Sequence, residues 1–375
     1  MNGKLNKPFL LALIIAVVFL ISCDNHNTKP GGAGERPKYV FLFIGDGMGF
    51  EHIAAAEAYL TAQSGAKVNL SFTSFPVTGE VTTHSADNKV TCSAAAGTAI
   101  AAGVKINNEV VGIDPQGRAV KSFTYELKKL GYKIGIATSV SIDHATPAAF
   151  YASAKHREHY YDIATQLAPS GFHYFAGSGF LYPSGEDGEQ ENVYDLIKQA
   201  GYEVVRTPSQ LNQTPYSQKI VAVQEEHRNS ETLVRAVQRT GGDGWTLMDF
   251  TKAGIERLNG SKGFFFMVEG GLIDFVSHDR DYDAMIHEMI DFSQSVEIAL
   301  EFYKNHPNQT LIIVTSDHET GGLSANGGNN GYKWTTDKHT GVPVPIFALG
   351  AGSGLFRGKL DNIDIAKKIK YLMIN

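Results

Sequence analysis

Short apolar runs alternate with helix-like stretches along most of the chain. The apolar runs are rich in β-branched and aromatic residues, which is typical of strands buried on both faces; they cover residues 38–44, 133–137, 263–268, 310–316 and 344–348. Shorter strand-like runs lie at 203–205 and 219–223, and helical patterns lie at 51–63, 122–130, 193–200, 245–258, 282–305 and 363–373. This alternation predicts an α/β fold, a three-layer sandwich in which a central, mostly parallel sheet is flanked by helices.

The ends of the apolar runs carry side chains of the types that bind metal ions. Asp46 stands between two glycines directly after the first run, and Asp317 and His318 follow the run that ends at residue 316. Asp274 and His278 are four residues apart, so one helical turn would place both on one face, a geometry suited to zinc. Because functional groups gather where the strands of an open α/β sheet end, we expect a metal site there.

Two further segments contribute polar residues to this picture. His144 and Thr146 follow the second apolar run, and we expect an extended segment in which the two side chains point the same way. His339 precedes the last apolar run. A single histidine is more often a surface or core residue than a ligand, but several strand ends that all deliver ligands favour a real site.

A run of small residues from Ser93 to Gly103 predicts a close-packed helix with Ser93 in its first turn. Free N–H groups at that end of a helix attract anions. Small side chains also let a substrate or another backbone segment approach closely. Ser93 is therefore the candidate for nucleophilic chemistry, although a capped core helix explains the same pattern.

The N-terminal segment has the features of an export signal. Lys4 and Lys7 precede an apolar run from residue 9 to residue 21, which is too short for the roughly 20 residues that a membrane-spanning helix needs. Its ending, Leu20 to Cys23, resembles the lipobox of bacterial lipoproteins, in which lipid is attached to the cysteine. We expect a lipoprotein signal at 1–22, a flexible tether at 23–37 and one catalytic domain at 38–375, with a plain secretory signal as the alternative.

The net charge and the cysteine content limit which binding partners and disulfides we expect. The formal net charge is −6 and no basic block occurs, which argues against a nucleic-acid partner. With Cys23 lipidated or removed, Cys92 has no partner for an intramolecular disulfide. We therefore expect an exported protein, anchored through lipid at Cys23 in the periplasm or outer membrane of a bacterial envelope.

The residues around Ser93 resemble the signature of the alkaline phosphatase family. Val90 to Thr98 fits the family pattern at every position but one, and the likeness runs from about Lys38 to the C-terminus. The resemblance implies hydrolysis of small-molecule phosphate monoesters, with Ser93 as the nucleophile that forms a phosphoserine and Arg157 as the residue that binds the phosphate. The resemblance also leaves open whether the protein forms a homodimer.

The resemblance further implies two zinc ions and one magnesium ion. One zinc would be held by Asp274, His278 and His339, and the second by Asp46, Asp317 and His318. Magnesium would share Asp46 with Thr146 and Glu269, with His144 at the edge of that site. The oxygen ligands suit magnesium, and the imidazole and carboxylate ligands suit zinc.

Three positions depart from the family pattern. Cys92 stands in place of an aspartate that helps to orient the arginine, and a thiol is a weak acceptor. Phe275 stands where several relatives carry Lys or His near the phosphate, and His144 matches a histidine in some relatives but an aspartate in others. Only 20 residues separate His318 from His339, so we expect the large insertion of some relatives to be absent there.

Three other functions fit part of the pattern. A related metal-dependent hydrolase could act on phosphodiesters or sulfate esters. A phosphate-binding lipoprotein could have lost catalysis through the change at Cys92. A structural lipoprotein without metal would require the ligand clusters to be coincidental.

Overall fold

The computed structural model describes residues 36–224, 231–241, 244–325 and 331–374. The predicted signal, Cys23 and most of the predicted tether lie outside these residues. Among the described residues, no helix has both the length and the apolar character that a membrane crossing requires.

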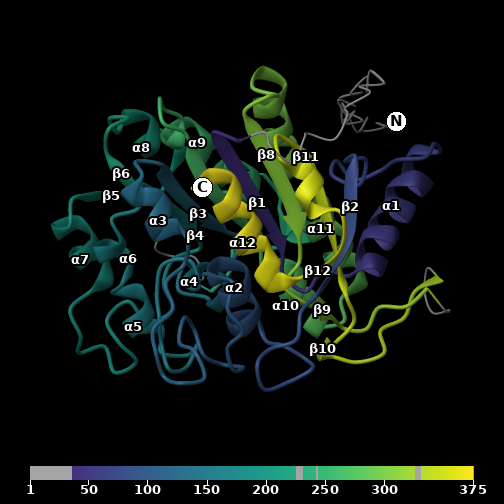
Figure 1. Ribbon diagram of the computed structural model, residues 1–375, viewed down its shortest axis with the longest axis horizontal. Helices are drawn as coiled ribbons and strands as arrows, with labels where there is room; N and C mark the ends of the chain where they lie inside the picture. The colour runs from purple at the N-terminus through teal and green to yellow at the C-terminus, as the bar shows by residue number, and fades with distance from the viewer. Residues whose placement is uncertain (1–35, 225–230, 242–243, 326–330, 375) are drawn as a thin grey trace, which may run out of the picture.

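A ten-stranded, mostly parallel sheet forms the centre of the molecule (Figure 1). Its order is β12-β2-β11-β8-β1-β7-β3-β4-β6-β5, and β11 runs antiparallel to both of its neighbours. The strands are β1 Tyr39–Gly45, β2 Val77–Thr82, β3 Lys133–Thr138, β4 Tyr174–Gly177, β5 Tyr202–Val205, β6 Lys219–Val223, β7 Phe264–Gly270, β8 Thr310–Thr315, β11 Val344–Gly350 and β12 Gly358–Asp361. A two-stranded sheet pairs β9 Glu319–Thr320 with β10 His339–Thr340.

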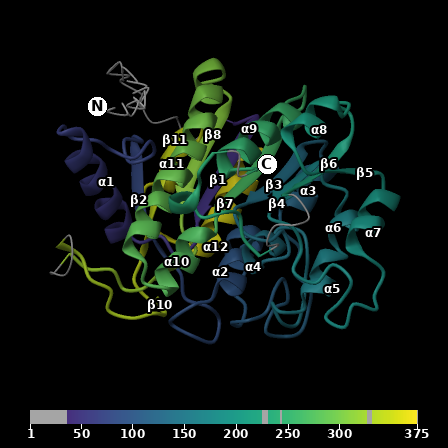
Figure 2. The ribbon, with the colours of Figure 1, turned by 180° about the vertical axis from the view of Figure 1, so that it is seen from behind.

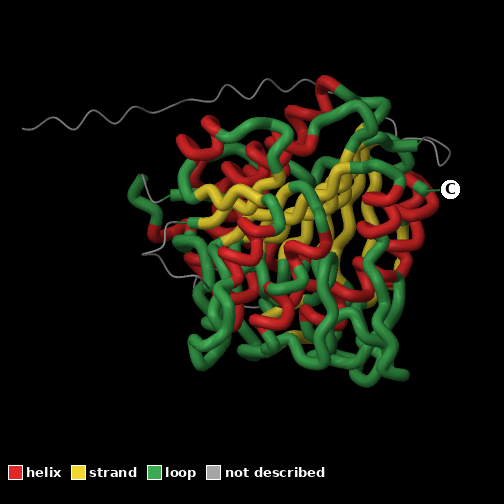
Figure 3. Tube along the Cα trace, turned by 90° about the vertical axis from the view of Figure 1, so that its left-hand side faces the viewer, coloured by secondary structure: helices red, strands yellow, loops and turns green. Residues whose placement is uncertain are grey.

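Helices cover both faces of the sheet, which confirms the predicted three layers (Figures 1, 2 and 3). The face turned to the viewer in Figure 1 carries α2 Ser93–Ala102, α3 Thr124–Lys129, α4 Ala145–Ala148, α5 Tyr160–Ala164, α6 Leu167–Ser170, α7 Val193–Gln199 and α12 Asn362–Met373. The opposite face carries α1 Phe50–Ser64, α8 Pro208–Gln213, α9 Leu247–Leu258, α10 Leu272–His278 and α11 Tyr282–Asn305. Within the described ranges, 3₁₀ turns lie at Ala236–Gln238 and Ser353–Phe356.

Strand β1 shows how the sheet is held between two cores. Val40, Leu42 and Ile44 pack into the core on the α2 and α12 side, whereas Phe41 and Phe43 pack into the core on the α11 side. The strand is buried along its whole length, and each such side chain contributes roughly 1.5–3 kcal/mol by leaving water. This packing fixes the point at which β1 ends and Asp46 begins.

The predicted strands and long helices are confirmed, with bounds shifted by a few residues. The expectation of an extended segment at His144 and Thr146 is wrong, because residues 145–148 form the helical turn α4 with His144 as its N-cap. Pro147 is compatible with this turn, since an N–H in the first turn of a helix has no intrahelical acceptor.

Strands β2, β4 and β12 were not predicted from the sequence. β4 is apolar and buried but has only four residues and ends in Gly177, and β12 is largely polar, so neither carries the longer apolar run that marks a buried strand. β2 contains Gly79 and polar residues between Val77 and Val81. Pairing with neighbouring strands, rather than their own composition, defines these three elements.

Candidate active site

The four neighbouring parallel strands β8, β1, β7 and β3 bring the predicted ligands to one edge of the sheet. Ile44 of β1 lies in register with Glu269 of β7, and Glu269 lies in register with Thr138 of β3. Asp46 follows β1 directly and Asp317 follows β8. Parallel strands that end in register therefore place these side chains together, as predicted for the edge of an open α/β sheet.

Three groups of ligand atoms assemble at this edge, and within each group the atoms lie within 4.8 Å of one another. They are Asp274 with His278 and His339; Asp46 with Asp317 and His318; and Asp46 with His144 and Glu269. The Thr146 hydroxyl lies 3.4 Å from Asp46 Oδ2. All nine residues predicted as metal ligands thus come together, with Asp46 in two groups.

Two imidazole nitrogens with lone pairs face each other in the group of Asp274, His278 and His339. His278 Nδ1 donates to the Asp337 carbonyl at 2.6 Å and His339 Nδ1 donates to the Thr91 carbonyl at 2.9 Å, so in each neutral ring Nε2 bears a lone pair. The two Nε2 atoms are 3.1 Å apart, and they lie 3.4 and 3.6 Å from Asp274 Oδ1. Two ligands of one tetrahedral zinc stand about 3.3 Å apart. The three donors therefore fit a zinc ion.

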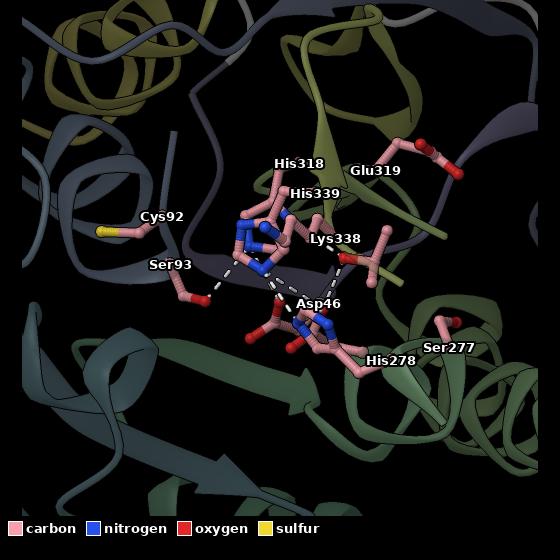
Figure 4. Close-up of polar contacts among 12 residues, drawn as sticks. Asp46, Cys92, Ser93, Ser277, His278, His318, Glu319, Lys338 and His339 are labelled. Atoms are coloured by element: carbon pink, nitrogen blue, oxygen red, sulfur yellow. Dashed lines mark hydrogen bonds and ion pairs between the residues drawn. The ribbon is translucent and has the colours of Figure 1, made fainter. Parts of the chain in front are cut away.

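The second group orients His318 in the same way (Figure 4). Thr320 Oγ1 donates to Asp274 Oδ1 and lies 3.3 Å from His318 Nδ1, so it accepts the Nδ1 proton. His318 Nε2 is then a lone-pair nitrogen, 3.4 Å from Asp46 Oδ1 and 3.3 Å from Asp317 Oδ2. The Ser93 hydroxyl donates to this nitrogen at 3.1 Å. The candidate nucleophile thus points directly into a ligand group.

Several buried polar atoms at this edge have no hydrogen-bond partner among the described residues. They are Asp46 Oδ1, Asp317 Oδ2, Glu269 Oε1 and His144 Nδ1. An unsatisfied buried polar atom costs roughly 1–3 kcal/mol, so such atoms rarely occur without a reason. All four belong to the two groups that share Asp46. Cations bound by the three carboxylate oxygens would satisfy those atoms, and the oxygen-rich group of Asp46, Glu269 and Thr146 suits magnesium. His144 Nδ1 differs, because Nε2 accepts from Arg157 and the proton of the neutral ring therefore lies on Nδ1.

The pKa shifts of the buried ligands also indicate that the site lacks positive charge. Burial, reinforced by neighbouring carboxylates, raises the pKa of Asp46 well above its usual range and that of Asp317 to about 7. Burial also raises the pKa of Glu269 to about 7. The hydrogen bond with Asp274 raises the pKa of His278 to about 9. The direction of these shifts indicates that the carboxylates and the His278 imidazole favour a positive charge, from a proton or a cation, at these positions.

Burial has the opposite effect on the imidazoles at the centre of the site. It lowers the pKa of His318 well below the usual range and that of His144 to about 3. Burial alone would raise the pKa of Asp274, but the hydrogen bond from His278 and the nearby imidazoles outweigh it and hold that pKa low. Neutral imidazole and ionised carboxylate are the forms that bind zinc.

Arg157 lies beside the ligand groups and is held by two contacts. Its Nη2 donates to His144 Nε2 at 2.9 Å, and its backbone N–H donates to the Glu109 carbonyl at 2.7 Å. The Glu109 N–H in turn donates to Cys92 Sγ at 3.1 Å. Cys92 is the N-cap of α2, so the loop around Glu109 connects the start of that helix to Arg157.

A cavity of about 440 Å³ opens onto the site. The residues that line it include His144, Arg157, Asp274, His278 and His339. Phe275 also lines it, with its ring 5.7 Å from the ring of His144. Ser93 is fully buried and is not among the residues that line this cavity.

Helix α2 begins at Ser93, as predicted, and its small residues permit close packing. A Cβ atom on Gly97 would lie 3.3 Å from both Ala149 Cβ and Thr146 Cα. The glycine therefore lets α2 approach the turn that carries Thr146. This contact ties the nucleophile helix to one of the ligand segments.

Sequence reasoning missed three polar residues at the site. Thr138 donates to Glu269 Oε2, and Thr320 donates to Asp274 Oδ1. Glu109 has φ of 65°, a left-handed conformation that is costly for a residue with a Cβ. The position of Thr138 at the end of a predicted strand, and that of Thr320 two residues after His318, were the available signals. No comparable signal marks Glu109.

Comparisons with known proteins agree with this geometry. A profile of the alkaline phosphatase family matches residues 37–333. Alkaline phosphatase 4 of Bacillus subtilis (strain 168) is 31% identical, over 98% of this chain and 96% of that protein. The solved structure of alkaline phosphatase from the Antarctic bacterium TAB5 is 32% identical and superimposes with a TM-score of 0.80, over 90% of this chain and 99% of that one.

A variant of the TAB5 enzyme is also similar. In that structure a histidine is replaced by glutamate and Mg is bound in the M3 site. It is 29% identical to this chain, with a TM-score of 0.78, over 90% of this chain and 98% of that one.

Proposed function

The chain belongs to the alkaline phosphatase family of phosphoric monoester hydrolases, and from this premise we propose that it hydrolyses small-molecule phosphate monoesters through a phosphoserine on Ser93. The observation that supports this most is the contact between Ser93 Oγ and His318 Nε2, at 3.1 Å. The same nitrogen faces two buried carboxylates. A serine oxygen set against a metal-type donor group is the arrangement that activates a nucleophile.

We propose that the three ligand groups hold two zinc ions and one magnesium ion. Zinc would occupy the group of Asp274, His278 and His339 and the group of Asp46, Asp317 and His318. Magnesium would occupy the group of Asp46, Glu269 and Thr146, with His144 beside it. When bound, these ions would lower the pKa of the serine hydroxyl and neutralise charge on the phosphoryl and leaving oxygens.

The residues of the chain would then carry out two displacements. The Ser93 hydroxyl loses its proton to water and its oxygen attacks phosphorus; the Oγ–P bond forms, the ester P–O bond breaks, and the leaving alkoxide takes a proton from water. Water attacks the phosphoserine next, which breaks the Oγ–P bond, releases phosphate and returns a proton to Ser93 Oγ. The Arg157 guanidinium presents N–H donors to the phosphoryl oxygens, and its bond to His144 holds it among the residues that line the cavity.

Metal content measured together with a substrate panel tests this function. The dialysed full-length protein should retain zinc, and turnover of an aryl phosphate monoester should exceed that of the matching diester and sulfate ester by at least about 100-fold. Higher diester or sulfate turnover would assign the site to a related hydrolase. Phosphate binding without any turnover would indicate a binding protein that has lost catalysis, and absence of bound metal would contradict the proposal.

We also propose that the protein is exported and anchored through lipid on Cys23. This residue lies outside the described residues, so the support is the sequence Leu20 to Cys23 alone. The protein should partition with membranes and carry a lipid-modified N-terminal peptide, whereas a Cys23→Ser variant should lose the modification. Recovery of unmodified wild-type protein in the soluble fraction would favour a plain secretory signal.

A further inference from the structure

A buried histidine that is not among the ligand groups links two of the ligand segments. His52 lies in the first turn of α1, six residues after Asp46, and its side chain is fully buried. Its Nδ1 accepts a hydrogen bond from the Gly49 N–H at 3.2 Å, and its Nε2 lies 3.2 Å from Ser277 Oγ. Gly49 belongs to the loop that carries Asp46, whereas Ser277 belongs to α10.

The hydrogen bonds fix the state of the His52 ring. A backbone N–H can only donate, so Nδ1 must bear a lone pair. The single Ser277 hydroxyl proton is directed to the Ile273 carbonyl at 2.6 Å, so Ser277 Oγ accepts from His52 Nε2–H. Both constraints give the same neutral tautomer. Burial, which lowers the pKa of His52 to about 4 despite the nearby Asp274 charge, supports it.

Ser277 lies between two members of one ligand group in the chain. It follows Asp274 by three residues and precedes His278 directly (Figure 4). A hydrogen bond that holds Ser277 therefore fixes the rotation of α10 about its axis. The chain of bonds from Gly49 through His52 and Ser277 to Ile273 joins the Asp46 loop to this helix.

The Asp46 loop also packs directly on Asp274. Gly47 has φ of 75°, and a Cβ atom there would lie 2.9 Å from Asp274 Oδ1 and 2.9 Å from Thr320 Oγ1. The Gly47 N–H donates to Asp317 Oδ1 at 3.2 Å. A small shift between the loop and α10 would therefore move ligands of two groups relative to each other.

A helix cap explains only half of what His52 does. The Gly49 bond corresponds to one half of a capping box at the start of α1, in which the side chain at the third helical position accepts from the N-cap N–H. The Ser277 bond crosses to another element 225 residues away in the chain and adds nothing to the cap. The ring also packs edge-on against Trp334 at 5.6 Å, on the segment that leads to His339.

We infer that His52 is a positioning residue, which acts through the Gly49 loop and Ser277 to set the spacing between the group of Asp46, Asp317 and His318 and the group of Asp274, His278 and His339. The inference rests on the proposed function, because it assumes that these groups hold zinc. Its measurable property is how tightly the metal is held. Outer-shell hydrogen bonds of this kind typically change metal affinity by about 10–100-fold.

The test measures the rate of zinc release from the loaded, full-length protein to a chromophoric chelator. His52→Phe keeps a planar ring without either hydrogen bond, and it should release zinc at least about tenfold faster than the wild type. Ser277→Ala breaks the same link from α10 and should have a similar effect. Since both changes cut one link, the double variant should release zinc no faster than the faster single variant.

His173 offers a matched control at the opposite edge of the sheet. It directly precedes β4, its Nδ1 accepts the Ile134 N–H at 3.2 Å, and burial lowers its pKa to about 4 as well. His173→Phe should therefore cost stability without changing zinc release. If His52→Phe fails to fold, His52→Asn, which keeps an acceptor for Gly49 but cannot reach Ser277, should still release zinc faster.

A separate kinetic measurement distinguishes positioning from a loss of general stability. The kcat of His52→Phe should be low in limiting zinc and should rise toward the wild-type value in excess zinc, whereas KM should change little. Zinc release equal to that of the wild type in the His52 and Ser277 variants would overturn the inference, as would additive effects in the double variant. A wild-type protein that binds no zinc would instead contradict the proposed function.

Discussion

Two buried clusters of charged residues in this molecule differ in how their polar atoms are satisfied. At the carboxyl edge of β1, β7 and β8, Asp46, Glu269 and Asp317 each have an oxygen without a hydrogen-bond partner among the described residues. On α11, by contrast, Asp291 accepts bonds from two nitrogens of Arg239, and Glu288 accepts from the Ala236 N–H at 2.6 Å.

A perturbed pKa does not separate the two clusters. Burial raises the pKa of Glu288 to about 8, much as it raises those of Asp317 and Glu269 to about 7. The difference is that Arg239 and the Ala236 N–H supply partners to the α11 carboxylates, whereas one oxygen of each sheet-edge carboxylate has no partner among the described residues. Buried ligand atoms that lie close together and lack hydrogen-bond partners therefore indicate a cation site, whereas unusual pKa values alone do not.

The largest expected effect comes from removing a ligand that two groups share. Asp46→Asn should lower kcat/KM by at least about 10³-fold and reduce bound metal, because Asp46 belongs to two ligand groups, one proposed to hold zinc and the other magnesium. Steady-state kinetics and metal analysis measure this.

Asp291→Asn is the matched change in the paired cluster. It should leave kcat/KM within about twofold per folded molecule but lower the free energy of unfolding by about 3–5 kcal/mol, since it leaves Arg239 buried without its carboxylate. Retained zinc and activity in Asp46→Asn, or loss of zinc in Asp291→Asn, would remove the distinction between the clusters.

The next largest effect is expected from pH, which should change the zinc affinity of the sheet-edge cluster. Zinc binding at pH 7 must displace protons, because the pKa of Asp317 is about 7 and that of His278 is about 9. Apparent zinc affinity should therefore fall as the pH falls through 7 and rise toward pH 9, by about tenfold per pH unit for each proton released. Chelator competition at pH 6, 7 and 8 measures this, and an affinity independent of pH would be inconsistent with protonated ligands.

The smallest effect is expected at Cys92, outside the ligand groups. Its sulfur accepts from the Glu109 N–H, and the Glu109 carbonyl holds the Arg157 backbone. Cys92→Asp should therefore change the inhibition constant for phosphate through Arg157, by up to about tenfold, and leave bound zinc unchanged. Loss of zinc in this variant would show that Cys92 supports the ligand groups themselves.

Much of the site could be predicted from the sequence because its residues follow buried strands. Asp46 and Asp317 stand directly after apolar runs, and the spacing of Asp274 and His278 required a helical turn that α10 provides. The resemblance to a known family added Glu269, which directly follows the apolar run 263–268, and Arg157, whose own surroundings in the sequence are not distinctive.

The remaining residues depend on contacts that sequence periodicity does not encode. His52 resembles any polar residue near a helix start, and its partner Ser277 is 225 positions away. Glu109 reaches the site through a left-handed backbone conformation that glycine usually adopts. The helical turn of α4 was mistaken for an extended segment because four residues are too few to show a helical period.

The phosphorylation state of Ser93 during turnover tests the central claim most directly. Rapid mixing with an aryl phosphate, followed by acid quench and peptide mass analysis, should give a burst of released alcohol and one phosphate on the peptide that contains Ser93, and Ser93→Ala should abolish both. Full turnover by Ser93→Ala, or a burst with no phosphate on Ser93, would contradict a phosphoserine mechanism.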